Sequence, residues 1–130
     1  MENEDKREEP RYRAHWRVTI NFDEAQNRPP IYGYTGDLSL SGMAVHVETN
    51  VASLSQATIL LALPMLPGES QQKIIKIRVQ LLYSVYSGSN SCFRIGLQYI
   101  DFTDNGRQVL QDRIKRQFCV GTASEMLKFS

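Results

Sequence analysis

The sequence predicts an all-β domain, a six-stranded antiparallel barrel closed by one C-terminal helix. Two observations indicate this class. Between residues 16 and 100, six segments alternate apolar and polar side chains, and clusters of Gly, Pro, Ser and Asn separate them. The expected strand at 73–86 is also unusually long. Such a strand can bend and pair at both of its ends, which favours a closed barrel over a flat sheet with free edges.

The strands can be justified one by one. The first, at 16–22, reads WRVTINF and combines aromatic with β-branched side chains, which fit the pleated surface of a sheet. The other five share its alternation and lie at 31–40, 43–48, 58–63, 73–86 and 92–100. Turn-forming residues interrupt the pattern at Pro29-Pro30, Ser41-Gly42, 64–68 and 87–90. No helical pattern lies between these strands, so neighbours along the chain are expected to pair antiparallel.

Residues 103–118 predict one helix, and 119–130 form a C-terminal tail. Thr103 or Asp104 can cap the start of the helix. An apolar stripe at helical spacing should lie on the barrel; it consists of Val109, Leu110, Ile114 and Phe118. Basic residues crowd the last turns, where the helix dipole favours cations: Arg113, Lys115 and Arg116.

Composition bounds the function. The chain has 130 residues, 42% of them hydrophobic and 22% charged, which suits one globular domain with a core that needs no metal or disulfide. Fifteen basic against 14 acidic side chains argue against a large sequence-independent DNA binder. The longest apolar run, 57–66, is too short to cross a membrane. The first residues, MENEDKREE, lack the apolar core of a secretory signal, so we expect a cytoplasmic protein in which Cys92 and Cys119 are reduced.

Residues 1–15 form a charged arm that we expect to be flexible unless a ligand or a neighbour orders it. The acidic residues stop at Glu9, and every charge from Pro10 to Phe22 is basic. The guanidinium group is planar and forked, so it can pair with guanine, hold a phosphate or stack on a base. The arginines form two pairs with four-residue spacing: Arg7 with Arg11, and Arg13 with Arg17.

The segment 37–42 reads DLSLSG. Alternation in an extended strand would place its polar side chains on one face and its leucines on the core face: Asp37, Ser39 and Ser41 opposite Leu38 and Leu40. The apolar phase then shifts to Met43, so a bulge or tight turn is expected at Ser41-Gly42, where glycine would allow a positive φ. A carboxylate and a hydroxyl beside such a turn suit a planar ligand edge such as that of guanine. A polar, solvent-facing strand end is the plainer interpretation.

At this point the residues resemble a known family. An N-terminal R-x-x-x-R, then a strand, then D-x-S-x-x-G is similar to the signature of PilZ domains, six-stranded barrels that bind the bacterial second messenger cyclic di-GMP. The second motif is present as Asp37, Ser39 and Gly42. The first can be either arginine pair. We favour Arg7 and Arg11, because Pro10-Arg11 lies before the first strand, whereas Arg17 falls within it.

The resemblance implies a ligand site for cyclic di-GMP. Arg7 and Arg11 would hold guanine edges and phosphates, Asp37 and Ser39 would accept a guanine, and Gly42 would shape the turn. The arm would fold over one or two ligand molecules and so create a surface for an unidentified downstream protein. Three further residues are possible contacts: Lys6, which stands where many members carry another arginine, Arg13 and Tyr83. The alternation of 73–86 instead places Tyr83 in the core.

The resemblance therefore predicts a bacterial receptor, linked to motility or biofilm regulation, that requires no cofactor and performs no catalysis. The alternative is a ligand-free PilZ-like interaction module with a role in pilus assembly or motility. The remaining chemistry-bearing residues favour neither a metal site nor an enzyme. His15, His46 and the two cysteines lack the close spacing of zinc ligands. Asp37, Ser39 and His46 are triad residue types without a nucleophile elbow.

Overall fold

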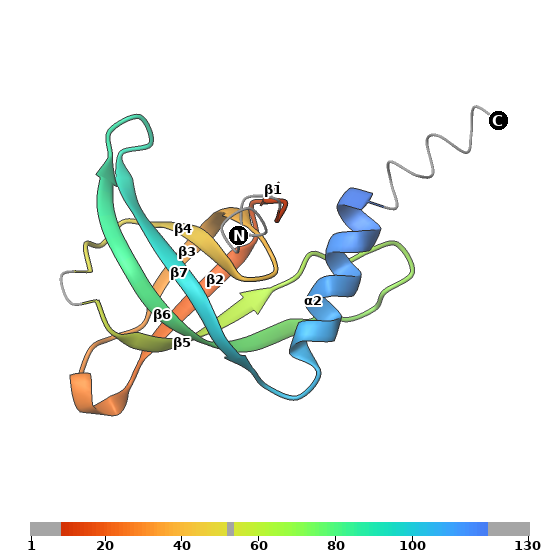
Figure 1. Cartoon of the computed structure of the whole chain (residues 1–130), viewed down its shortest axis with the longest axis horizontal. Helices are drawn as coiled ribbons and strands as arrows, with labels where there is room; N and C mark the ends of the chain where they lie inside the picture. Colours follow the sequence, from red (N-terminus) through yellow and green to blue (C-terminus); the bar gives the residue numbers. More distant parts are fainter. Residues whose placement is uncertain (1–8, 52–53, 120–130) are drawn as a thin grey trace, which may run out of the picture.

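Six strands close into a ring. The computed structural model describes residues 9–51 and 54–119, and the ring strands are β2 (Arg17–Phe22), β3 (Ile31–Leu38), β4 (Gly42–Val47), β5 (Gln56–Ala62), β6 (Ile74–Ser87) and β7 (Cys92–Phe102). Their hydrogen-bonded order is β3-β2-β5-β6-β7-β4, and β4 pairs back onto β3. Every neighbouring pair is antiparallel. The predicted six-stranded antiparallel barrel is confirmed (Figure 1).

The arm contributes a short additional strand, β1 (Tyr12–Arg13), which pairs antiparallel with β3. Tyr12 lies opposite Leu38 and Arg13 lies opposite Asp37. The arm was expected to be flexible unless a neighbour orders it, and for residues 12–13 the neighbour is the strand that carries Asp37. Between β2 and β3 the chain makes one short 3₁₀ turn, η1 (Glu24–Gln26).

Alternating apolar residues fill the barrel, as the period-two pattern predicts. In β6 every second residue from Ile75 to Leu81 is buried. Tyr83 does not continue this series, because the pairing of β6 with β7 is irregular between Leu81 and Tyr83. The irregularity shifts the phase by one residue, and Tyr83 is 37% exposed. The core placement of Tyr83 is therefore wrong.

One helix follows the barrel (Figure 1). It is shorter than 103–118 and consists of α2 (Gly106–Ile114) and a π-helical end, η2 (Lys115–Cys119). Neither predicted cap is used: Asp104 adopts a left-handed conformation with φ 56°, and the residue at the cap position, Asn105, makes no side-chain cap hydrogen bond. The apolar stripe is confirmed. Leu110 and Ile114 are buried, and the ring of Phe118 stacks on that of Tyr12 with centroids 4.8 Å apart.

The helix is also attached to the β5–β6 loop by a buried charge. Arg113 is 3% exposed, and its guanidinium donates to Glu69 Oε2 at 2.7 Å and to the carbonyl of Pro64. The sequence predicted only that the C-terminal end of the helix dipole favours a cation such as Arg113. The structure shows that Arg113 also has specific partners far away along the chain. Within residues 9–51 and 54–119, no helix has the length and apolar character needed to cross a bilayer.

Candidate functional site

The turn between β3 and β4 is built around the hydroxyl of Ser39. This oxygen accepts the backbone N–H groups of Ser41 at 3.2 Å and Gly42 at 3.3 Å, and the Ser39 N–H donates to the Gly42 carbonyl at 2.8 Å. Ser and Thr hydroxyls commonly stabilise turns in this way. Ser39 is consequently fully buried, whereas Leu40 at the corner is half-buried. The expectation that Ser39 points outward beside Asp37 is wrong because extended alternation ends at Leu38, whereas Leu40 does pack against the core, although only partly buried.

Gly42 is required for space rather than for a positive φ. Among the described glycines only Gly68 has a positive φ. A Cβ on Gly42 would instead overlap the carbonyl oxygen of Leu97 on the neighbouring strand β7. The tight turn at Ser41-Gly42 is present, but the strand irregularity lies earlier, between Thr35 and Asp37.

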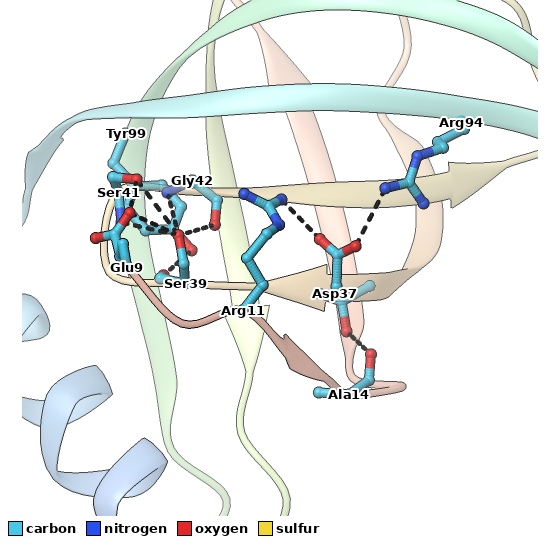
Figure 2. A network of polar contacts seen from close by, with 10 residues as sticks. Glu9, Arg11, Ala14, Asp37, Ser39, Ser41, Gly42, Arg94 and Tyr99 are labelled. Atoms are coloured by element: carbon cyan, nitrogen blue, oxygen red, sulfur yellow. Dashed lines mark hydrogen bonds and ion pairs between the residues drawn. The ribbon is translucent and has the colours of Figure 1, made fainter. Parts of the chain in front are cut away.

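Asp37, at the end of β3, lies between two arginines from distant parts of the chain (Figure 2). Its Oδ1 is 2.7 Å from Arg11 Nη2 on the arm, and its Oδ2 is 3.1 Å from Arg94 Nη2 on β7. Burial raises the pKa of Asp37, but the hydrogen bonds from Arg11 and Arg94 outweigh burial and hold the pKa below its ordinary value. The side chain is therefore an anion that joins the arm to the barrel.

Arg94 and Glu9 are site residues that sequence reasoning missed. Burial lowers the pKa of Arg94, but Asp37 and Tyr83 outweigh burial and raise the pKa above the ordinary arginine value. Arg94 pairs with His46 across the β4–β7 ladder. In the sequence it is one arginine at an alternating strand position, and only the pairing of β4 with both β3 and β7 brings it to Asp37. The isolated charge of Asp37 in the sequence signals that a cation should lie near it, but it does not single out Arg94.

Glu9 forms a second contact between the arm and the turn (Figure 2). Its Oε1 accepts the hydroxyl of Ser41 at 2.5 Å and that of Ser39 at 3.4 Å. From β7, the phenol of Tyr99 donates to the Ser39 carbonyl at 3.0 Å, and burial raises the pKa of Tyr99. The turn is thus supported from the barrel by Tyr99 and covered from the arm by Glu9.

A pocket of about 380 Å³ opens beside this network, between the turn and strands β6 and β7. Arg11, Tyr83 and Arg94 line it with their side chains. The ring of Tyr83 lies directly over Gly96, and a Cβ on Gly96 would overlap that ring. The pocket therefore combines two guanidinium groups and an aromatic ring, which are the groups that hold phosphates and stack on bases.

The structure places the described members of the two arginine pairs at different points of the fold. Arg11 reaches Asp37, whereas Arg17 belongs to β2 and lines a different, larger hollow of about 850 Å³ over β2, β3 and β5. Arg13 of β1 lies opposite Asp37 of β3. Together with Arg94, it borders a smaller hollow. Arg7 and Lys6 lie outside the described residues.

Of the candidates for metal binding, His15 and His46 border one hollow, and Cys92 is not among the residues that line it. The ring of His15 stacks on Tyr34 with centroids 4.1 Å apart. Burial, followed by the charge of Arg94, lowers the pKa of His46. Cys92 is half-buried at the start of β7, and the side chain of Cys119 lies outside the described part. Over residues 9–51 and 54–119, no three His, Cys, Asp or Glu side chains cluster as a metal site would require.

Comparison with known proteins assigns this architecture. A family model described as PilZ domain matches residues 5–116. No curated protein matches the chain in sequence. Both arginine pairs and the Asp37–Gly42 segment fall within the matched region.

Three solved structures resemble the chain. The Bacillus subtilis inhibitor of motility (MotI/DgrA) has a TM-score of 0.65 at 20% identity, over 85% of this chain and 50% of that one. The PilZ domain of YcgR from Escherichia coli, solved with c-di-GMP, has a TM-score of 0.61 at 17% identity, over 95% and 98% of the two chains. The MrkH–c-di-GMP complex of K. pneumonia has a TM-score of 0.51 at 16% identity, over 95% of this chain and 55% of that one. The chain thus spans about half the length of MotI and MrkH, and these identities show the fold alone.

The pairing of Asp37 predicts an acid-sensitive contribution to stability. Because the folded pKa lies below the unfolded one, the ionised carboxylate stabilises the fold above about pH 4, and this contribution is lost as the pH falls through the folded pKa. Asp37→Asn should lower the free energy of unfolding near neutral pH by about 1 kcal/mol or less. Its difference from the unsubstituted protein should shrink below about pH 4 in urea titrations. The control is Asp101→Asn on β7, and a difference that stays constant with pH contradicts the assignment.

Gly42→Ala tests whether space or backbone conformation requires the glycine. The added methyl group must push β4 away from the Leu97 carbonyl, which should cost about 1–3 kcal/mol in the free energy of unfolding. Gly88→Ala is the matched control, because a Cβ there meets no atom within 4 Å. Equal thermal midpoints for the two variants would refute the steric explanation.

Proposed function

This chain belongs to the PilZ domain family, and from that premise we propose that it is a cyclic di-GMP receptor that performs no catalytic step. One observation carries the proposal. Arg11 and Asp37, which are 26 residues apart and belong to the two family motifs, form an ion pair; Arg11 lines the pocket that Tyr83 and Arg94 also line, and Asp37 lines the smaller hollow that shares Arg94 with it.

The proposed chemistry follows from the ligand's two guanine bases and two phosphates. The guanidinium of Arg11 can take the O6 and N7 atoms of a guanine or a phosphate oxygen. Asp37 is an anion and can accept the N1–H and N2–H groups of a guanine. Tyr83 offers a ring on which a base can stack, and Arg94 adds a second cation. Arg7 would add a further guanidinium from the arm.

Ser39 and Gly42 would act through the turn. The Ser39 hydroxyl is already engaged with the backbone of the turn, and Gly42 lets β4 pack close to β7. We therefore propose that these two residues hold the backbone in shape for the ligand, while the exposed hydroxyl of Ser41 is the nearer polar contact.

The proposal includes a signalling step. Arg11 pairs with Asp37 without ligand, so ligand binding would exchange this ion pair for contacts to guanine and phosphate. β1 spans only two residues, which makes the arm inexpensive to rearrange. The rearranged arm would present a new surface to a downstream protein.

One observation favours the alternative, a ligand-free interaction module. The polar groups of the site have partners within the chain: Asp37 has Arg11 and Arg94, and the Ser41 hydroxyl has Glu9. A site that satisfies its own charges can persist as a structural feature. Titration with the ligand separates the two functions.

Calorimetric titration of the purified chain with cyclic di-GMP tests the proposal, with cyclic di-AMP and GTP as controls. Saturable binding that is selective for cyclic di-GMP is the expected result, and its stoichiometry gives the number of ligand molecules bound. The absence of both heat and thermal stabilisation up to about 1 mM ligand would reject the receptor and leave the interaction module.

Substitution of single arginines tests the assignment of residues. Arg11→Ala should weaken binding tenfold or more, about 1.4 kcal/mol per tenfold, because a charge-assisted contact is lost. Arg17→Ala is the matched control and should bind almost normally, since Arg17 lies over the other hollow. Asp37→Ala should also weaken binding while its thermal unfolding stays cooperative. Normal affinity in Arg11→Ala, or a large loss in Arg17→Ala, reverses the choice of arginine pair.

A further inference from the structure

Glu9 lies within the favoured arginine motif, yet its side chain is negatively charged, as is the ligand that the motif is proposed to bind. It stands between Arg7 and Arg11, and its carboxylate accepts hydrogen bonds from the hydroxyls of Ser41 at 2.5 Å and Ser39 at 3.4 Å. A short hydrogen bond to an ionised acceptor is stronger than one between neutral groups. The arm thus places an anion of its own on the turn.

The two contacts of the arm are mechanically linked. Glu9 and Arg11 are separated by Pro10, whose ring fixes the backbone φ angle. Glu9 accepts the turn hydroxyls, and Arg11 pairs with Asp37. The two contacts therefore start from arm positions that are separated by a single residue. Movement of Arg11 toward a ligand therefore also pulls on the contact between Glu9 and Ser41.

The contact also lies at the edge of the candidate pocket. Ser41 and Arg11 both line the pocket of about 380 Å³. An anionic ligand that reaches the Ser41 hydroxyl from the pocket would meet the carboxylate of Glu9 as a like charge, and partly buried charges are screened little by salt. The carboxylate and a ligand phosphate therefore compete for the same neighbourhood.

We propose that Glu9 is an affinity-determining residue, an internal anion that occupies the Ser41 hydroxyl and must be displaced by a phosphate oxygen of the ligand. The identity of that ligand rests on the proposed receptor function. In the unliganded protein, Glu9 keeps the arm on the turn and lowers the fraction of molecules ready to bind. The apparent affinity falls by that fraction, so removing the contact strengthens binding.

Two variants test the displacement. Glu9→Gln removes the charge but keeps the size of the side chain, and Ser41→Ala removes the hydroxyl and leaves the charge in place. Glu9→Gln should lower the Kd for cyclic di-GMP by about 2- to 10-fold in calorimetric titration, whereas Ser41→Ala, which also takes the hydroxyl away from the ligand, should not lower it. Glu48→Gln is the control for net charge, because Glu48 lines the other hollow. Unchanged or weaker binding in Glu9→Gln, or an equal gain in Glu48→Gln, overturns the proposal.

A measurement without ligand separates this proposal from the receptor itself. Trypsin cleavage after Arg11 and Arg13 reports how often the arm leaves the turn. Glu9→Gln and Ser41→Ala should each be cleaved about 2- to 10-fold faster than the unsubstituted chain, and Glu48→Gln should not. If the chain binds no cyclic di-GMP, the receptor proposal fails whatever the cleavage rates. If cleavage is unchanged while cyclic di-GMP binds, Glu9 does not hold the arm and the proposal for Glu9 fails alone.

Discussion

The ion pairs of Asp37 connect the parts on which this site depends. One carboxylate, at the end of β3, holds Arg11 from the arm and Arg94 from β7 at 2.7 and 3.1 Å. Its two partners outweigh its partial burial, so the carboxylate remains charged and keeps both guanidinium groups near the pocket. Without this anion, two cations would face each other beside a weakly attached arm.

Backbone packing sets the position of that anion. The irregularity between Thr35 and Asp37 turns the end of β3, and the hydroxyl of Ser39 then fixes the turn that follows. Gly42 lets β4 pass close to β7, and β7 is the strand that carries Arg94. The family motif therefore includes residues that shape the backbone as well as residues that can reach a ligand. Ser39 and Gly42 belong to the first kind, and we propose Asp37 for the second.

The arm has two uses for its charges. In the unliganded chain, Arg11 and Glu9 satisfy groups on the barrel that would otherwise face water. The same groups are those a guanine or a phosphate would take. A receptor built in this way exchanges one set of charged contacts for another, so the net free energy of binding is smaller than the contacts alone suggest. Under the proposed function, the position of the arm would report whether the ligand is present.

The sequence by itself determined the parts that depend on local periodicity. Alternation defined the six ring strands, four-residue spacing defined the stripe of α2, and the Asp37–Gly42 segment located the tight turn. It did not determine the exposure of Tyr83, the burial of Ser39 or the start of the helix. At Tyr83 an irregular strand pairing breaks the local period, at Ser39 a side-chain hydrogen bond does, and at the helix start a left-handed residue does. Arg94 and Glu9 were decided only by the tertiary structure. Closure of the barrel brings Arg94 next to Asp37, and docking of the arm brings Glu9 next to Ser41, contacts between residues too far apart along the chain for any local pattern to encode.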